Sequence, residues 1–138
     1  MTGHRERLTG LYDALNAAWG DDPGEHLDEI REYADPDIEL VVPREYLDVG
    51  QLRGYEGLEQ WLTMAAGVFD SWRYELEDVL DMGEDRAVAL LRAWIRGKAS
   101  GAEMELRAAH VIDFRAGRVV RLAVYRDRSQ ALAAVGLA

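Results

Sequence analysis

The 138-residue sequence contains no cysteine, which excludes disulfide bonds, thiol catalysis and cysteine-ligated metal centres. Long apolar runs are also missing: none exceeds five residues, whereas a membrane-spanning helix needs about 20. Basic residues are few, with 16 Lys and Arg against 26 Asp and Glu and a formal net charge of -10. Because nucleic-acid binding depends on a basic surface, we expect neither a nucleic acid nor a membrane as a partner.

Motifs for metal and cofactor binding are missing as well. The three histidines, His4, His26 and His110, lie far apart and lack the spacing of metal ligands. The glycine-rich strings that bind nucleotides do not occur, so we expect neither a metal nor a cofactor. The N-terminal residues are not followed by an apolar signal segment, and we therefore expect a cytoplasmic protein.

The composition is that of one globular domain over residues 1–138, with 49% hydrophobic and 30% charged residues. Apolar residues three and four positions apart predict helices over Arg5–Trp19 and Glu56–Phe69. A shorter helix is predicted between them, with Leu27, Ile30 and Ala34 on one side. A short strand over Ile38–Val42 follows it, and residues 43–54 are predicted to form a loop.

The second half of the chain has the pattern of strands separated by glycine-containing turns. Asp127 is predicted to cap a last helix that Gly136 ends. Helices first and consecutive hairpins afterwards indicate an α+β fold. The four predicted strands are Trp72–Met82, Arg86–Gly97, Ala102–Arg115 and Arg118–Arg126.

The strand over Ala102–Arg115 alternates most clearly between apolar and charged residues, which fixes its two faces. Glu105 and Arg107 belong to the charged face, and His110 is the one polar group on the apolar, inner face. Leu122 and Val124 of the next strand should continue that face. The full apolar face consists of Met104, Leu106, Ala108, His110, Ile112 and Phe114.

The strand over Arg86–Gly97 admits two assignments. We place the side with Arg92 and Trp94 inside, because the small residues of the opposite side would fill a core poorly. That opposite side would then join Ala109, Val111 and Ala123 in an apolar outer patch suited to a homodimer. In the alternative assignment, Leu91 and Ile95 belong to the core and Arg92 is exposed. The opposite side consists of Ala87, Ala89, Leu91, Ala93 and Ile95.

Several short strings, in order along nearly the whole chain, carry a family resemblance. They are Ala14-Leu15-Asn16-Ala17, Ala34-Asp35-Pro36-Asp37, Gly54-Tyr55-Glu56-Gly57, Ser100-Gly101, Gly117-Arg118-Val119-Val120-Arg121 and the tail from Tyr125. Together they resemble the SnoaL-like polyketide cyclases of the nuclear transport factor 2-like superfamily. The resemblance implies a cone-shaped α+β barrel, with three N-terminal helices on a strongly curved, mainly antiparallel sheet and a short C-terminal helix. It also implies a pocket on the concave face and dimers through the outer face.

The catalytic residues of this family and its relatives are matched only in part. His110 stands at the position of a pocket histidine of the cyclases, but Val124 occupies the position of their acid/base aspartate. Val41 stands where the more distant ketosteroid isomerases carry a base carboxylate. Arg92 matches a strand arginine of the limonene epoxide hydrolases and lacks its carboxylate partner. The resemblance therefore supplies a fold without an intact mechanism.

We accordingly predict a small-molecule pocket protein that binds an aromatic or polyketide-like carbonyl compound. The alternative is a cofactor-free cyclase or isomerase with His110 as acid/base or oxyanion donor. Candidate catalytic residues are His110 and Arg92. Each also has a structural interpretation, as a histidine bonded to Tyr12 or Asn16 and as an arginine in a salt bridge. Candidate ligand-binding residues, each of which could instead be core, are Tyr12, Asn16, Trp19, Tyr46, Trp61, Met64, Trp94, Leu122 and Val124.

Overall fold

The computed structural model describes residues 3–18, 23–43 and 51–137. Its α+β architecture confirms the predicted fold class. The helices are α1 (His4–Ala18), α2 (Pro23–Arg31), α3 (Gly54–Val68) and α4 (Arg128–Ala134). The strands are β1 (Ala34–Val41), β2 (Gln51–Arg53), β3 (Phe69–Asp81), β4 (Arg86–Gly97), β5 (Glu103–Arg115) and β6 (Arg118–Tyr125). None of these helices is long and apolar enough to cross a membrane.

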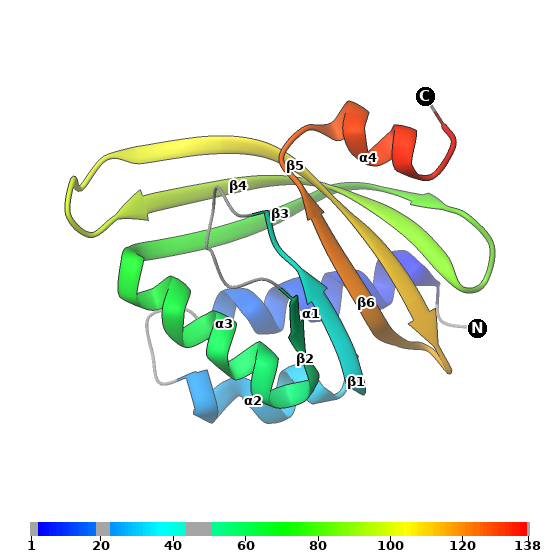
Figure 1. Ribbon diagram of the computed structural model, residues 1–138, viewed down its shortest axis with the longest axis horizontal. Coiled ribbons are helices and arrows are strands. Elements are labelled where there is room, and N and C mark those ends of the chain that lie inside the picture. Colours follow the sequence, from blue (N-terminus) through cyan, green and yellow to red (C-terminus); the bar gives the residue numbers. More distant parts are fainter. Residues whose placement is uncertain (1–2, 19–22, 44–50, 138) are drawn as a thin grey trace.

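The strands form one sheet in the order β2-β1-β6-β5-β4-β3. Only the β1–β6 pair is parallel among the described strands, and the other pairs are antiparallel. Strands of 12 and 13 residues twist and curl. Figure 1 shows α1, α2 and α3 gathered on one side of the curved sheet and α4 on the other.

Two predicted boundaries around β1 are wrong. The strand begins at Ala34, although that residue was assigned to the preceding helix, and Pro36 lies inside it. The parallel ladder with β6 shifts register between Ala34 and Glu39, so the missing N–H of Pro36 is tolerated there. The predicted loop over 43–54 also contains β2, whose three residues are too few to show alternation. Residues 44–50 of that loop lie outside the described residues.

The main hydrophobic core lies between the concave face of the sheet and helices α1, α2 and α3. Leu8, Leu11 and Leu15 of α1 are buried in it, as the helical period predicts. Ile112 and Phe114 of β5 belong to this core and His110 contacts Tyr12 of α1, which confirms the inner face predicted for that strand from His110 onward. Met104, near the start of the strand, is 53% exposed.

The faces of β4 are the reverse of the preferred prediction. Ala89 lies opposite His110 and Leu91 opposite Ala108, so the small-residue side of β4 belongs to the core. Arg92 lies opposite Arg107 on the convex face, as the alternative assignment proposed. Small residues suffice on the concave side because large rings from neighbouring elements fill the space. Tyr12, Trp72 and Tyr74 supply those rings.

Only the β5 and β6 part of the predicted apolar outer patch exists, and this chain covers it. Ala109, Val111 and Ala123 form a second buried cluster with Val88, and Ala131 of α4 packs into it. Its prediction as an exposed dimer surface is therefore wrong, because the chain returns over the sheet after β6. The predicted cap of α4 is confirmed: the carboxylate of Asp127 accepts a hydrogen bond from the backbone N–H of Ser129 at 2.8 Å.

Candidate functional site

A small, partly open cavity lies between the concave face of the sheet and helices α1 and α3. Its volume is about 30 Å³. Four of the predicted site residues meet in its wall: Trp61, His110, Leu122 and Val124. The described lining residues are Leu11, Leu15, Ile38, Leu40, Val42, Leu58, Trp61, Tyr74, His110, Leu122 and Val124. Within this set the wall is aliphatic apart from the rings of Trp61, Tyr74 and His110.

His110 is positioned by the centre of the sheet. It lies on β5 between Ala89 of β4 and Val124 of β6, two smaller residues that leave room for the imidazole ring. The phenol oxygen of Tyr12, on α1, lies 2.6 Å from its Nδ1 atom. Both residues are only 2% exposed. No other hydrogen bond of the imidazole ring occurs within the described part of the chain.

Burial keeps both groups of this pair neutral. Desolvation lowers the pKa of His110 from 6.5 to about 3. Desolvation, with the nearby phenol of Tyr74 as a second cause, raises the pKa of Tyr12 well above its usual value of 10.0. A neutral phenol is a better donor than an imidazole N–H, and an unprotonated imidazole nitrogen is the better acceptor. Tyr12 therefore donates to Nδ1, which leaves the single ring proton of His110 on Nε2.

An aromatic cluster holds the pair in place. The Tyr74 ring packs against Tyr12 and, edge-on, against His110, with centroid distances of 5.4 Å and 5.5 Å. The side chain of Asn16 holds the Tyr74 backbone at both of its polar groups. Its Nδ2 donates to the Tyr74 carbonyl at 2.9 Å, and its Oδ1 accepts from the Tyr74 N–H at 2.8 Å. Asn16, a predicted ligand contact, thus fixes the position of Tyr74 and lies outside the cavity wall.

Three other predicted site residues do not face the cavity. Met64 is 38% exposed on α3. Trp94 lies on the convex face of β4, opposite Glu105. Arg92 lies on the same face, with its Nε 2.9 Å from a carboxylate oxygen of Glu105 and its Nη2 3.3 Å from one of Glu77. Arg92 therefore forms salt bridges, as its structural interpretation proposed.

Trp19 and Tyr46 were predicted ligand contacts, and both lie outside the described residues. Tyr74 was missed, although it contributes both to the cavity wall and to the aromatic cluster. Its signal is the spacing of Trp72, Tyr74 and Leu76, which places three large apolar side chains on one face of a strand. Among the described residues, no three acidic or histidine side chains gather into a metal site.

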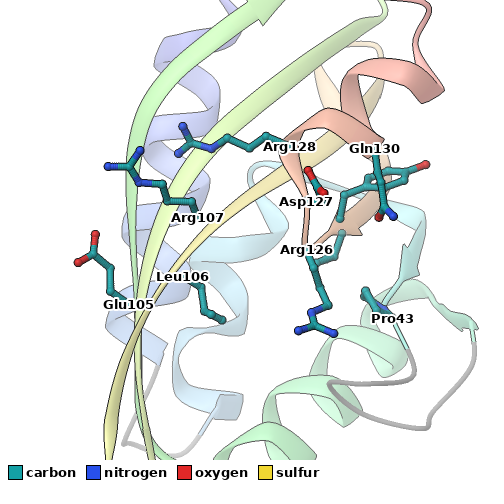
Figure 2. Close-up of a pocket in the computed structure, with 10 residues that line it drawn as sticks. Pro43, Glu105, Leu106, Arg107, Arg126, Asp127, Arg128 and Gln130 are labelled. Atoms are coloured by element: carbon teal, nitrogen blue, oxygen red, sulfur yellow. The ribbon is translucent and has the colours of Figure 1, made fainter. Parts of the chain in front are cut away.

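A wider groove of about 880 Å³ lies where β6 ends and the chain turns toward α4. Figure 2 shows Arg126 extending toward Pro43, while Arg107 and Arg128 extend the other way over the sheet. The groove acids have partners of their own, since Glu105 pairs with Arg92 and Asp127 caps α4. Val124 belongs to the lining of both the groove and the cavity, so the two lie on either side of this residue.

The sequence and the fold resemble those of known proteins. A family model described as a SnoaL-like domain matches residues 8–122. No curated protein matches the sequence. Several solved structures share the fold at low identity, so their likeness extends to the fold alone.

An NTF2-like protein of unknown function from Burkholderia pseudomallei aligns with a TM-score of 0.76 at 17% identity, covering 99% of each chain. TerC, co-crystallised with polyporic acid, aligns with a TM-score of 0.75 at 20% identity, covering 92% of this chain and 93% of TerC. A protein from Jannaschia sp. CCS1, described as a SnoaL-like polyketide cyclase by similarity, aligns with a TM-score of 0.70 at 18% identity, covering 97% of this chain and 92% of that one.

Proposed function

Because the chain belongs to the SnoaL-like domain family, we propose that it binds a small, largely apolar molecule in the cavity beneath the concave face of the sheet. The observation that carries this proposal is the His110 ring in a cavity wall that is otherwise made of aliphatic side chains and the rings of Trp61 and Tyr74. Ligand sites are typically apolar with a few polar groups that orient the ligand. An aromatic or polyketide-like carbonyl compound fits this description. The complex of TerC, a distant structural relative, with polyporic acid lends support.

The size of the cavity limits how a ligand enters. A volume of about 30 Å³ leaves room for only a few water molecules, whereas pockets for drug-sized ligands measure roughly 300–1,000 Å³. A water there would find few polar partners in the aliphatic wall, which favours a dry cavity. Binding therefore requires a state in which the wall has moved apart, and the ligand stabilises that state. Leu58 and Trp61 on α3 and Leu11 and Leu15 on α1 form the wall segments that would separate from the sheet.

Catalysis by acid/base chemistry receives less support than binding. With a pKa of about 3, His110 carries no transferable imidazolium proton at neutral pH. No carboxylate occurs among the described lining residues, and Val124 lies directly opposite His110 on β6. The role that remains open for a cofactor-free enzyme is donation of a hydrogen bond to a developing oxyanion.

Binding can be tested with compact carbonyl compounds, because the cavity is small. We expect cyclopentanone and 1,4-naphthoquinone to raise the unfolding temperature and to shift the NMR signals of Leu11, Leu122 and Val124. A ligand at 100 times its dissociation constant adds about 2.7 kcal/mol of stability. Val124→Phe, which fills the cavity from β6, should abolish both effects. Equal shifts in this variant, or none in the wild type, would contradict the proposal.

The earlier expectations of a homodimer and a cytoplasmic location enter here as proposals. With the apolar patch covered by α4, a dimer through the outer face would use its charged part around Trp94, whose ring is approached by the guanidinium groups of Arg73 and Arg92. Sedimentation of the wild type and of Trp94→Glu would test this. A monomeric wild type at tens of micromolar, the order at which weak pairs associate, would exclude the dimer.

A further inference from the structure

We propose that Tyr12 fixes the His110 ring in the tautomer that carries its N–H at Nε2, and that a ligand reaches this N–H once the cavity wall has moved apart. The ring then selects ligands with a hydrogen-bond acceptor, such as a carbonyl oxygen, over ligands that can only donate. This inference rests on the proposed function and makes Tyr12 a positioning residue for it.

The geometry leaves the ring little choice of tautomer. The Tyr12 oxygen lies 2.6 Å from Nδ1, a short distance that fits a phenol O–H donating to an unprotonated imidazole nitrogen. In the other tautomer, Nδ1 would donate to the phenol oxygen, and the phenol hydrogen would need an acceptor of its own. The described structure gives the Tyr12 hydroxyl no hydrogen-bond partner apart from His110. A buried donor left unpaired would disfavour that tautomer by about tenfold or more.

The surroundings prevent the pair from rearranging. Tyr12 is 2% exposed and packs against the Tyr74 ring, whose backbone is held by Asn16. On the other side, β4 and β6 flank His110 with Ala89 and Val124, neither of which can donate to or accept from the ring. The phenol is therefore the one side-chain group, among those described, that sets the ring proton.

The same arrangement disfavours anionic ligands. Burial lowers the pKa of His110 to about 3, so the ring provides no positive charge at neutral pH. Arg92 points to the convex face and pairs with Glu77 and Glu105. A carboxylate in the cavity would therefore lose its hydration without gaining a cation. The expected ligand class is neutral, compact and equipped with an acceptor.

The tautomer can be read directly in the full-length wild-type protein. ¹⁵N NMR of His110 should show Nδ1 as an unprotonated, hydrogen-bonded nitrogen and Nε2 as a protonated one. Tyr12→Phe removes the phenol donor, so the ¹⁵N signals of both ring nitrogens should shift toward the values of a mixture of tautomers. A protonated Nδ1 in the wild type would overturn the inference without any need for a folded variant.

Selectivity is tested with three five-membered rings of similar size: cyclopentanone, which accepts, pyrrole, which donates, and cyclopentane, which does neither. In the wild type we expect cyclopentanone to bind about tenfold more tightly than pyrrole, the ratio that one well-placed hydrogen bond supports. In Tyr12→Phe this preference should shrink several-fold. Tyr55→Phe is the matched control, because it removes a phenol hydroxyl that donates to the Ala34 carbonyl outside the cavity wall. Its preference should equal that of the wild type.

The outcomes separate the two proposals. If none of the three rings binds, the proposed function fails and this inference fails with it. If cyclopentanone and pyrrole bind the wild type equally, binding stands and the role of Tyr12 is refuted. If Tyr12→Phe keeps the full preference for cyclopentanone, another group fixes the ring and the role of Tyr12 is again refuted.

Discussion

Acid should destabilise this protein through His110 well before its carboxylates titrate. In the unfolded chain the imidazole binds a proton below its ordinary pKa of 6.5, whereas in the folded protein burial lowers that pKa to about 3. Between these values the unfolded state binds more protons than the folded state, so stability falls as the pH falls. The contribution of neutral His110 is fully present above pH 6.5 and is lost progressively toward pH 3.

The magnitude follows from the size of this pKa difference. Each pKa unit corresponds to about 1.36 kcal/mol, so lowering the pH from 7.5 to 4.5 should remove about 3 kcal/mol of unfolding free energy. The complete loss near pH 3 would be about 5 kcal/mol, an upper bound for a fully buried ring. For a domain of this size, a loss of 3 kcal/mol is a large share of the total stability.

The assay is urea unfolding at pH 7.5, 6.0, 5.0 and 4.5, followed by tryptophan fluorescence. The reference is the double variant Tyr12→Phe/His110→Leu, which replaces both partners of the buried bond by apolar groups and leaves neither unpaired. Carboxylates contribute equally to both proteins, so their effects cancel in the difference. The reasoning is refuted if the stability difference between wild type and reference stays constant from pH 7.5 to pH 4.5.

Three further outcomes follow from other contacts. Leu58→Ala should lower the free energy of unfolding by about 2–5 kcal/mol and enlarge the cavity, so that cyclopentane binds in an NMR titration. Leu62→Ala is the control, because Leu62 is buried in the same helix but lies outside the cavity wall. It should destabilise the protein without allowing cyclopentane to bind. Ala131→Asp should place a carboxylate in the cluster beneath α4, lower the Tm and expose the α4 amides to hydrogen exchange while the main core stays protected. Hydrogen bonds from Arg115 lower the pKa of Asp35, so the ionised carboxylate stabilises the folded protein. Asp35→Asn should therefore lower the urea midpoint at pH 7. The midpoints of wild type and variant should converge as the pH falls below 3.8 and the wild-type carboxylate protonates.

The inner face of some strands can be predicted from the pattern of that strand alone, whereas for others the pairing with a neighbouring strand is needed. The alternation in β5 is strong enough by itself to aim His110 inward, because a one-residue slip would bury charges such as Arg107. In β4 both sides carry apolar residues, so its own pattern could not decide which side is inner. The hairpin register would have decided it, because Arg92 lies opposite Arg107 and Arg107 belongs to the charged face of β5.

Other features depend on packing that no local pattern records. The covering of the apolar outer patch depends on where the chain turns after Tyr125, and β2 is too short to show a period. The cavity volume depends on how side chains from several elements meet, so the sequence can name wall residues such as Leu122 and Val124 without giving the space between them. Tyr74 could have been found from the spacing along β3, but its contact with His110 requires the curvature of the sheet.

Arg92 lies on the convex face of the sheet, so its positive charge is not available to a ligand in the cavity. With that guanidinium paired to Glu77 and Glu105, no cation among the described wall residues balances an anion in the cavity. With Val124 opposite His110, no carboxylate raises the pKa of the ring, and desolvation is the cause that sets it. What remains at the cavity is a neutral imidazole whose second nitrogen is occupied by Tyr12. Such a ring can hold a hydrogen bond but moves no proton at neutral pH, and for this reason the geometry favours recognition over acid/base catalysis.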